Sequence, residues 1–582
     1  MKILGISCYY HDSSACLVID GKIIAAAEEE RFTRIKHDNS FPINSINFCL
    51  EYGKIKSANI DNICFYEKPL LKLQRNILQH FKKAPFSFQA FLQSFSAWFK
   101  YKLWIKNKIR RDLNYKGKIY FIEHHQAHAA SSFFPSPFEK SAFLTLDGVG
   151  EWATTTYGIG KNNNIKILKE IRFPHSLGLL YSTITAYLGF TVNNSEYKVM
   201  GLSPYGNPNI YYNKFKKLLD IKEDGSFHLN MEFFDFHYKL TMPNHKMCQL
   251  FNLPIREKEA ELTQKHKDIA ASLQKITEEI IFKILNYLHQ KTNLDNLVLS
   301  GGVALNSIAN GKILKNTPFK YIYIQPAAGD GGNSIGAALF CYHQINNLKN
   351  RNIQDTTYLG PKFDNNYVKN FLDSKSIKYT YFSDKNKLIN KVANLIFHNN
   401  VIGWFQGRME WGPRALGNRS ILSNPTNPNM QAILNEKVKH REKFRPFAPA
   451  VCEDDALKYF KCDNPIPLPT DFMLMVYPIK KEFHKIIPSV THVDGSGRLQ
   501  TIRRFQNKDY YDLIKKFGKL SGIPILINTS FNIRGEPIVC TPQNAYKCMM
   551  GTGIDYTIIE NFLIKRDENP KDIWNSEILA KD

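Results

Sequence analysis

The sequence predicts an α/β protein with two domains, the first of which contains two similar halves. Three observations lead to this prediction. The chain has 582 residues, which exceeds what one hydrophobic core usually serves. Its composition, 43% hydrophobic and 13% aromatic, provides ample apolar side chains for packed cores and excludes a largely disordered chain. A strand–loop–strand pattern also occurs twice in the first third of the sequence.

The two halves begin with similar elements. In the first half, residues 2–8 and 15–19 read as strands around a polar loop, followed by an Asp-Gly hairpin signal and a third strand. In the second half, residues 141–146 and 153–159 flank the loop Asp147-Gly148-Val149-Gly150. This repetition predicts a duplicated nucleotide-binding core in which each half offers one loop to a shared cleft.

Further elements complete the first domain. Glycine-rich turns follow strand-like runs at Ser300-Gly301-Gly302 and at Gly329-Asp330-Gly331-Gly332, where backbone N–H groups can approach a phosphate or a ribose. Residues 269–288 carry apolar side chains every three or four positions, which predicts a long amphipathic helix. Residues 346–364 are rich in Asn, Lys and Asp, and we expect the domain boundary there.

The chain is strongly basic, with 77 lysines and arginines, 53 acidic residues and a formal net charge of +24. Such a surface can attract nucleic acid, an anionic membrane or phosphorylated small molecules. Lysine dispersed over the whole surface would give the same total, so the charge alone selects no partner.

The sequence also indicates where the protein works. No apolar run approaches the roughly 18–20 residues of a membrane-spanning helix, and residues 1–10 lack the pattern of a secretory signal. The ten cysteines form no C-x-x-C pair, which argues against a zinc ribbon and a thioredoxin-like motif. We therefore expect a soluble, cytoplasmic protein.

A metal site is predicted in the first domain. His124 and His128 are four residues apart and share one face if that segment is helical. Asp147 and Asp330 lie in the glycine-containing loops that should open on the same cleft. Two imidazoles and two carboxylates form a ligand set for Fe(II), our first choice, or for Mn or Zn. A histidine that only hydrogen-bonds in the core is the alternative.

The loop of the first hairpin offers a candidate base. His11 can take a proton from a nucleophile near neutral pH, and Asp12 can orient its ring. A histidine in a loop is also often structural.

The second region contains a cationic cluster with polar side chains. Arginine forks and lysine charges suit phosphate oxygens, and Ser and Asn can complete such a site. The cluster combines two arginines in a tight turn, a short basic stretch, a later arginine and two polar residues: Arg414 and Arg419; Lys437, Lys439, Arg441, Lys443 and Arg445; Arg498; and Ser530 and Asn532. The alternative is a solvated face, because Lys437, Lys439, Arg441 and Lys443 alternate as they would on one side of a strand.

Residues 81–111 combine basic and aromatic side chains. A basic amphipathic helix can lie on a membrane or bind an anionic acceptor. We favour the other interpretation, in which the aromatic rings pack on the main domain and the lysines face water.

Taken in order, the motifs resemble those of the carbamoyltransferase family of NodU/CmcH type, over nearly the whole chain. The motifs are Tyr10-His11-Asp12-Ser13, Glu28-Glu29-Glu30-Arg31-Phe32, His124-His125-Gln126-Ala127-His128, Glu196-Tyr197-Lys198-Val199-Met200-Gly201-Leu202, Ser300-Gly301-Gly302-Val303-Ala304-Leu305-Asn306, Gly329-Asp330-Gly331-Gly332, Gly412-Pro413-Arg414-Ala415-Leu416-Gly417 and Phe444-Arg445-Pro446-Phe447-Ala448-Pro449.

The resemblance implies a fold and a reaction. Residues 1–355 are expected to form a TsaD-like domain with an actin-like ATPase core, and residues 356–582 a YrdC-like α/β domain. The second domain is expected to make a carbamoyl-adenylate from carbamoyl phosphate and ATP with Mg. The first is then expected to transfer the carbamoyl group to a hydroxyl of a small molecule, a sugar or natural-product intermediate. By the same resemblance, the adenylate contacts in the first domain are Lys198, Gly301, Gly302 and Asn306.

Two other functions compete with this one. The first is an enzyme that makes threonylcarbamoyl-adenosine in tRNA, which would combine the same domain types and suit the net charge. The order of the motifs favours a small-molecule acceptor instead, so we expect no nucleic acid partner. An actin-like sugar kinase would explain the hairpins but not the second domain, and it would release ADP. The sequence selects neither the acceptor nor the oligomeric state.

Overall fold

The computed structural model describes residues 1–98 and 102–570, and the chain divides into two compact units. The first unit contains residues 1–29 and 37–354, and the second contains residues 30–36 and the chain from Asp355 on. The second unit thus begins beside the boundary that the sequence predicts. The inclusion of the short segment 30–36 in the second unit has no counterpart in that prediction.

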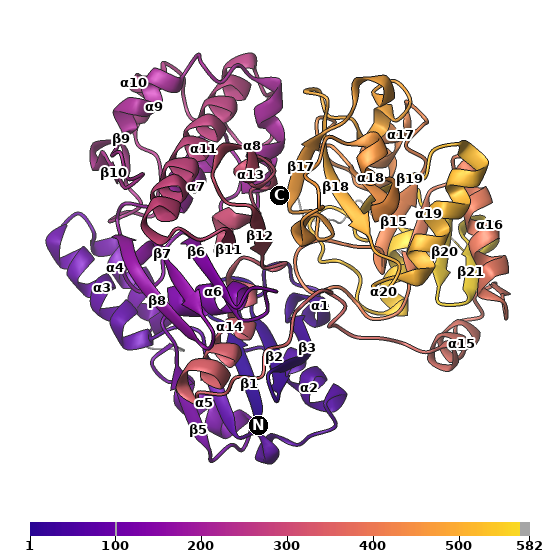
Figure 1. The fold of residues 1–582 in the computed structure, drawn as a ribbon, viewed down its shortest axis with the longest axis horizontal. Helices are drawn as coiled ribbons and strands as arrows, with labels where there is room; N and C mark the ends of the chain where they lie inside the picture. Colours follow the sequence, from indigo (N-terminus) through magenta and orange to yellow (C-terminus); the bar gives the residue numbers. More distant parts are fainter. Residues whose placement is uncertain (99–101, 571–582) are drawn as a thin grey trace. The chain divides into compact units, whose positions relative to one another are not determined.

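The first unit contains the same sheet topology twice (Figure 1). One sheet has the order β3-β2-β1-β4-β5, and the other has the order β8-β7-β6-β11-β12. In both sheets the first three strands in sequence are antiparallel and the last two add in parallel. The strands are β1 (Lys2–Ser7), β2 (Ser14–Ile19), β3 (Lys22–Glu28), β4 (Asn62–Phe65), β5 (Lys118–Phe121), β6 (Lys140–Leu146), β7 (Ala153–Lys161), β8 (Asn164–Arg172), β11 (Asn296–Ser300) and β12 (Tyr321–Ile324).

Helices α6 (His124–Phe133) and α14 (Asn333–Phe340) lie between these sheets and pack on each other. α6 follows the first sheet but packs on β6 and β11, whereas α14 follows the second sheet but packs on β1 and β2. Their approach depends on Gly336, where an added Cβ would lie 1.9 Å from the carbonyl oxygen of Ala127. The exchange of helices ties the halves into one duplicated, actin-like core, as predicted.

The predicted long helix is confirmed as α11 (Gln264–Thr292), with its apolar stripe buried. A capping box at Thr263 starts it, and Asn293 in the left-handed conformation ends it. The other main helices of the first unit are α2 (Ile43–Tyr52), α7 (Leu177–Tyr187), α8 (Glu196–Leu202), α9 (Tyr212–Leu218), α10 (His245–Phe251) and the short α12 (Ser307–Asn310).

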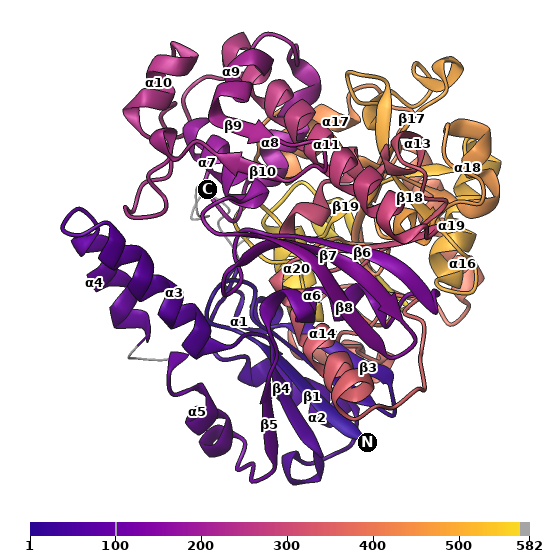
Figure 2. The same ribbon diagram turned by 60° about the vertical axis from the view of Figure 1, so that its left-hand side comes forward.

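Three helices cover the predicted basic aromatic segment. They are α3 (Pro69–Lys82), α4 (Phe88–Ala97) and α5 (Ile105–Asp112). Figure 2 shows α3 and α4 as a helical hairpin that projects from the sheets of the first unit. Phe99 and Lys100 of this segment lie outside the described residues.

The second unit is built on a mixed sheet with the order β13-β21-β20-β14-β15-β19-β16-β18-β17. Its strands are β13 (Thr380–Tyr381), β14 (Ile402–Phe405), β15 (Arg419–Ser423), β16 (Ala448–Cys452), β17 (Met475–Pro478), β18 (Ser496–Ile502), β19 (Ile525–Ser530), β20 (Tyr556–Ile559) and β21 (Phe562–Lys565). Its main helices are α15 (Asn365–Ser374), α16 (Lys385–Phe397), α18 (Glu453–Tyr459), α19 (Lys508–Ser521) and α20 (Pro542–Met550).

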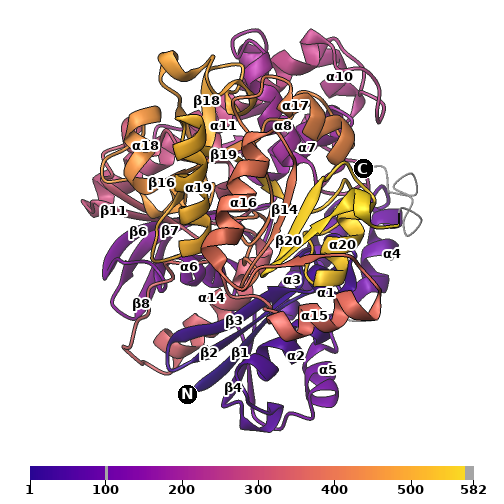
Figure 3. The same ribbon diagram turned by 90° about the vertical axis from the view of Figure 1, so that its right-hand side faces the viewer.

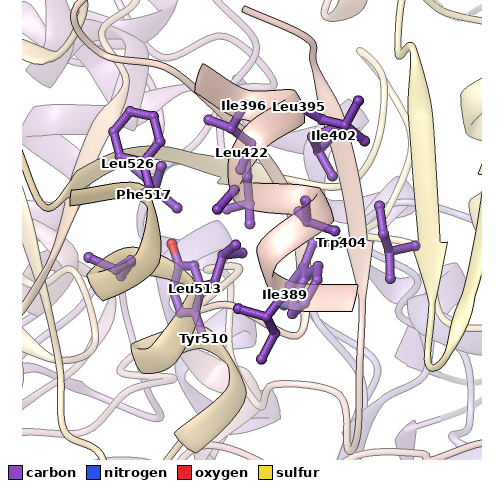
Figure 4. Close-up of a cluster of buried hydrophobic side chains, with 14 of the residues drawn as sticks. Ile389, Leu395, Ile396, Ile402, Trp404, Leu422, Tyr510, Leu513, Phe517 and Leu526 are labelled. Atoms are coloured by element: carbon purple, nitrogen blue, oxygen red, sulfur yellow. The ribbon is translucent and has the colours of Figure 1, made fainter. Parts of the chain in front are cut away.

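The core of the second unit lies where α16 and α19 pack side by side on this sheet (Figure 3). Ile389 and Ile396 of α16, Trp404 of β14, and Leu513 and Phe517 of α19 point toward one another there (Figure 4). Burial of such side chains stabilises the fold by about 1.5–3 kcal/mol each. Among the described residues, no helix combines the length and the apolarity needed to cross a membrane.

Candidate functional site

The predicted metal ligands converge in the first unit because corresponding ends of the two halves meet there. His124 and His128 lie in the first turns of α6, which follows β5. Asp330 lies in the turn before α14, which follows β12, and Asp147 follows β6. All four side chains are buried, and one ligand atom from each lies within 4.8 Å of the others.

The distances within this metal cluster (His124, His128, Asp147 and Asp330) are short. Nε2 of His124 lies 2.9 Å from Oδ2 of Asp147 and 3.5 Å from Oδ1 of Asp330. Nε2 of His128 lies 3.5 Å from the same Oδ1 and 3.1 Å from Nε2 of His124. Two ring nitrogens that face each other can share one proton, whereas both can donate electron pairs to one cation.

The surroundings fit a bound divalent cation. Neither carboxylate oxygen of Asp330 has a hydrogen-bond partner among the described residues, and a buried carboxylate without a partner is costly. A Cβ added at Gly329 would meet nothing within 4 Å, and at Gly148 or Gly331 nothing nearer than 3.7 Å. The mixed imidazole–carboxylate set therefore has room beside it for a ligand.

The charges in the cluster are strongly coupled. Burial disfavours ionisation of Asp147, but the hydrogen bond with His124 and the nearby His128 hold its pKa well below the usual range. Burial likewise disfavours the imidazolium of His128, yet Asp147 and Asp330 raise its pKa to about 9. The two carboxylates thus create a strong preference for positive charge at this point.

His11 and Asp12 lie at the edge of the metal cluster. Nδ1 of His11 is 2.9 Å from Oδ2 of Asp12, and its Nε2 is 3.8 Å from Oδ2 of Asp330. Asp12 also accepts from His37, 2.6 Å away, whose other nitrogen lies 2.8 Å from Oδ1 of Asn194. Although burial opposes it, Asp330 and Asp12 raise the pKa of His11 to about 10.

The glycine turn after β11 joins the metal cluster through its backbone. The N–H of Gly302 donates to Oδ1 of Asp147 at 3.0 Å. Gly301 has a φ of +93°, and a Cβ there would lie 2.1 Å from the carbonyl oxygen of Leu146, so this position requires glycine. Its N–H already donates to Ala328 at 2.7 Å.

The other predicted adenylate contacts have structural partners. The side chain of Asn306 caps α12 by accepting from Ala309 and exchanges two hydrogen bonds with Gln274. Lys198 is buried on α8, with Nζ 5.5 Å from the centre of the Phe190 ring. Adenylate binding by Lys198, Gly301, Gly302 and Asn306 stays a prediction.

Sequence reasoning missed two residues that position the candidate metal ligands. Glu151 accepts the backbone N–H of His124 with both oxygens at 3.1 Å and that of Lys68 at 2.8 Å, so it fixes the start of α6. Nδ2 of Asn333 lies 3.1 Å from Nε2 of His128. Asn333 directly follows the Gly-Asp-Gly-Gly motif, and that adjacency was the available signal.

In the second unit, Lys439 meets Ser530 and Asn532. Its buried Nζ donates to the Ser530 carbonyl, to the Ser530 hydroxyl at 3.3 Å, and to the backbone and side-chain oxygens of Asn532, both at 2.9 Å. None of these acceptors carries a charge. Burial, and then the positive charge of Arg441, lowers the pKa of Lys439 well below its usual range.

The predicted arginines surround one another in the same unit. Burial, and then the positive charges of Arg414, Arg441 and Arg445, lowers the pKa of Arg498 well below its usual range. Cations placed together at such a cost are characteristic of a site for a polyanion. We call Arg414, Lys439, Arg441, Arg445, Arg498, Ser530 and Asn532 the cationic cluster.

Residues 437–443 do not form the strand on which the alternative of a solvated face was based. Residues 434–438 form a π-helical turn and 439–447 an irregular loop. Lys437 and Lys443 are exposed, while Lys439 is buried and Arg441 is partly buried. The loop is shaped by Asn435, whose side chain accepts from Arg441 at 2.8 Å and donates to the carbonyl of Arg445 at 3.1 Å. No local pattern marks Asn435.

The turn that carries Arg414 is held by Glu410. One oxygen of this buried carboxylate accepts the backbone N–H groups of Leu416, Asn418 and Arg419 at 2.7–3.1 Å. Arg419 is fully buried, stacks 3.5 Å from the centre of the Phe405 ring and donates to backbone carbonyls, so it acts as a structural arginine.

Comparison with known proteins agrees with the motifs. The carbamoyltransferase N-terminus family matches residues 2–339, and the carbamoyltransferase C-terminus family matches residues 393–566. A protein of Synechocystis sp. is 46% identical over 605 residues, covering 98% of this chain and 97% of its own. The nodulation protein NolNO of Sinorhizobium fredii is 36% identical, covering 98% of this chain and 81% of its own.

Similarity to solved structures is weak. Full-length HypF in a phosphate- and nucleotide-bound form overlaps 58% of this chain and 55% of its own at 13% identity, with a TM-score of 0.30, which is too low to inform function. The matches to both halves of one family and the full-length relatives are decisive: the chain is a transferase enzyme that belongs to the carbamoyltransferase family.

Proposed function

We propose that this carbamoyltransferase uses ATP and carbamoyl phosphate, by way of a carbamoyl-adenylate, to carbamoylate a hydroxyl of a small molecule. The observation that carries the proposal is the division of chemistry within one chain. The first unit holds a buried cluster of two histidines and two aspartates, and the second unit holds a buried lysine among arginines. Two such sites can serve two different reaction steps.

The first step belongs to the second unit, which we propose is YrdC-like. Carbamoyl phosphate, ATP and one water give carbamoyl-adenylate, phosphate and pyrophosphate. Arg414, Arg441, Arg445 and Arg498 neutralise the phosphates, and bidentate arginine contacts orient them. Lys439, fixed by Ser530 and Asn532, adds a point charge at the centre of this group. Mg accompanies the ATP.

The second step belongs to the first unit. The acceptor oxygen forms a bond to the carbonyl carbon of the carbamoyl-adenylate, the bond from that carbon to the AMP phosphate oxygen breaks, and the hydroxyl proton leaves. We assign the role of receiving that proton to His11, and this role is supported by its hydrogen bond to Asp12, which leaves Nε2 toward the site.

The metal cluster supports this step. His124, His128, Asp147 and Asp330 would hold the cation, which we propose is Fe(II), with Mn and Zn as alternatives. Such an ion supplies positive charge for an adenylate phosphate or polarises a carbonyl oxygen. Charge compensation of Asp330 would also remove the main cause of the raised pKa of His11.

The acceptor class follows from the relatives by analogy. Several of them are named nodulation proteins, which is consistent with a sugar or natural-product hydroxyl as the acceptor. The lysine and arginine excess does not require nucleic acid, because part of it forms the cationic cluster.

The test is an incubation with ATP, carbamoyl phosphate, Mg and Fe(II), followed by a search of cell extracts for compounds that gain the mass of one carbamoyl group. We expect AMP, pyrophosphate and phosphate in equal amounts. ADP as the nucleotide product would contradict the proposal and indicate a kinase. Carbamoylation restricted to added tRNA would contradict the small-molecule acceptor.

A further inference from the structure

Helix α3 buries polar side chains and exposes apolar ones, the reverse of what an amphipathic surface helix usually does. Its polar side chains Lys72 and Arg75 are only 3% and 6% exposed, whereas Leu70, Leu78 and Phe81 face solvent. A surface helix normally turns its apolar stripe toward the core. The apolar stripe of α3 instead faces solvent, and it consists of Leu70, Leu71, Ile77, Leu78 and Phe81.

The orientation of α3 is fixed by contacts on its polar side. Nζ of Lys72 lies 2.6 Å from Glu67, and a guanidinium nitrogen of Arg75 donates to the carbonyl of Gly150 at 3.0 Å. Gln79 donates to the carbonyl of His237. Rotation of the helix to bury its leucines would break each of these contacts.

The apolar stripe continues around the turn between α3 and α4. Phe81, Phe86 and Phe88 are 82%, 79% and 63% exposed, and they flank the exposed Lys82 and Lys83. The expectation that the aromatic rings of this segment pack on the protein therefore holds only for part of it. A contiguous exposed patch of this kind marks an interaction surface.

The charge around this patch has one sign. Residues 68–111 contain eleven lysines and arginines and no acidic residue. Lys68, Lys72 and Lys108 form ion pairs with acidic residues outside this segment, whereas the exposed Lys82 and Lys83 lie at the patch itself. Two copies that met through this patch would bring like charges together, which disfavours self-association. An apolar stripe also contributes nothing to phosphate contacts with a nucleic acid. Both properties suit a bilayer with anionic lipids.

We propose that the α3–α4 hairpin docks the protein on the surface of an anionic lipid bilayer. The phenylalanines of the turn enter the boundary between headgroups and acyl chains, and Lys82 and Lys83 contact lipid phosphates. The hairpin lies beside the first-unit site, because Arg75 binds the loop that carries Asp147, and Lys72 lies 4.7 Å from the ring centre of Tyr10. This inference does not depend on the proposed reaction.

The test is flotation of the full chain with vesicles of phosphatidylcholine alone or mixed with phosphatidylglycerol. We expect binding only to the mixed vesicles, and its loss at about 1 M salt, where the Debye length falls to about 3 Å. Lys82→Gln with Lys83→Gln should weaken binding about 30-fold, from about 1 kcal/mol per cation. Phe81→Ser with Phe86→Ser and Phe88→Ser should weaken it at least about 100-fold.

The controls separate this surface from general stickiness and from the reaction. Phe505→Ser removes a phenylalanine that is 72% exposed in the second unit, and it should leave flotation unchanged. All variants should keep the wild-type thermal midpoint and the wild-type pyrophosphate yield without vesicles. Equal flotation with neutral vesicles, wild-type flotation of the triple phenylalanine variant, or a wild-type dimer that this variant abolishes would each overturn the proposal.

Discussion

Asp330 is the residue on which the proposed metal site most depends. Its carboxylate is completely buried and lacks a hydrogen-bond partner among the described residues, yet it faces both histidines at 3.5 Å. Removal of such a charge should weaken metal binding while sparing the metal-free fold, because a buried carboxylate without partners costs free energy.

We therefore predict that Asp330→Asn lowers the affinity for a divalent metal at least about 100-fold. Loss of a residue that only supports a ligand typically costs about 10–100-fold in affinity, and loss of an atom that contacts the ion should cost more. The metal content of the purified protein, measured by mass spectrometry, checks this. The matched control Asp295→Asn removes an exposed carboxylate and should retain the metal. Equal metal content in both variants would contradict the assignment.

The buried side chain of His343 should make the stability of the fold depend on pH. It is buried, stacks on Phe134 and lies 2.8 Å from the carbonyl of Leu348, and burial lowers its pKa to about 4. An unfolded histidine has a pKa of about 6.5, so between pH 4 and 6.5 the unfolded state binds the extra proton. Stability contributed by neutral His343 is complete above pH 6.5 and is lost as the pH falls toward 4.

The predicted loss from this one histidine is ~3 kcal/mol across that window, at about 1.4 kcal/mol per pH unit. Chemical denaturation of wild type and His343→Gln at several pH values measures it, and the variant should show a flatter pH dependence. His398→Gln, at an exposed helix end, should follow the wild type. If the free energy of unfolding fell by the same amount with pH in wild type and in His343→Gln, His343 would not be the cause of the pH dependence.

The candidate metal ligands could be identified from the sequence because each obeys a local rule. His124 and His128 are one helical turn apart, and Asp147 and Asp330 lie in glycine-containing turns at strand ends. Glu151 and Glu410 obey no such rule, because each accepts from backbone N–H groups brought near it only by the folded chain. Their importance is visible in three dimensions alone.

At the scale of elements, the turn between β14 and β15 shows how a carboxylate builds a loop. Glu410 satisfies three backbone N–H groups, and Gly417 has a φ of +108° with its Cα against the ring of Tyr510. The turn sets the position of Arg414. Loss of the carboxylate would leave buried donors unsatisfied, at about 1–3 kcal/mol each.

Glu410→Ala should accordingly destabilise the second unit by ~3 kcal/mol or more and raise the KM for carbamoyl phosphate. Denaturant unfolding and steady-state kinetics measure the two effects. Glu482→Ala, at an exposed position, is the control and should change neither. A stable Glu410→Ala enzyme with normal KM would show that the carboxylate does not shape this site.

The loop 439–447 and the hairpin α3–α4 show where sequence patterns mislead. Alternating charges at 437–443 are typical of a strand face, but the hydrogen bonds of Asn435 select a turn and a loop. The amphipathic period of α3 is clear in the sequence, but the period does not say which face is buried. That choice depends on Glu67, just before the helix, and on the carbonyl groups of Gly150 and His237, which are distant in the sequence.

For the whole molecule, the duplicated core could be predicted because the two halves repeat a strand–loop–strand pattern. The structure has two sheets with matching strand orders. The assignment of segment 30–36 to the second unit could not be predicted, because it depends on contacts with residues far away in the sequence. Arg34, for example, donates to the carbonyls of Pro537 and Ile538. The basic charge is divided among the cationic cluster, residues 68–111 and the remaining surface.

If each unit performs its own reaction step, a variant of one unit should lose one step and keep the other, and pyrophosphate release reports the first step. With ATP and carbamoyl phosphate, His124→Ala with His128→Ala should release pyrophosphate at the wild-type rate but form no O-carbamoyl product. Lys439→Ala should release none, yet it should transfer the carbamoyl group from added carbamoyl-adenylate. Normal pyrophosphate release by Lys439→Ala, or its loss in the double histidine variant, would contradict the division of the reaction between the units.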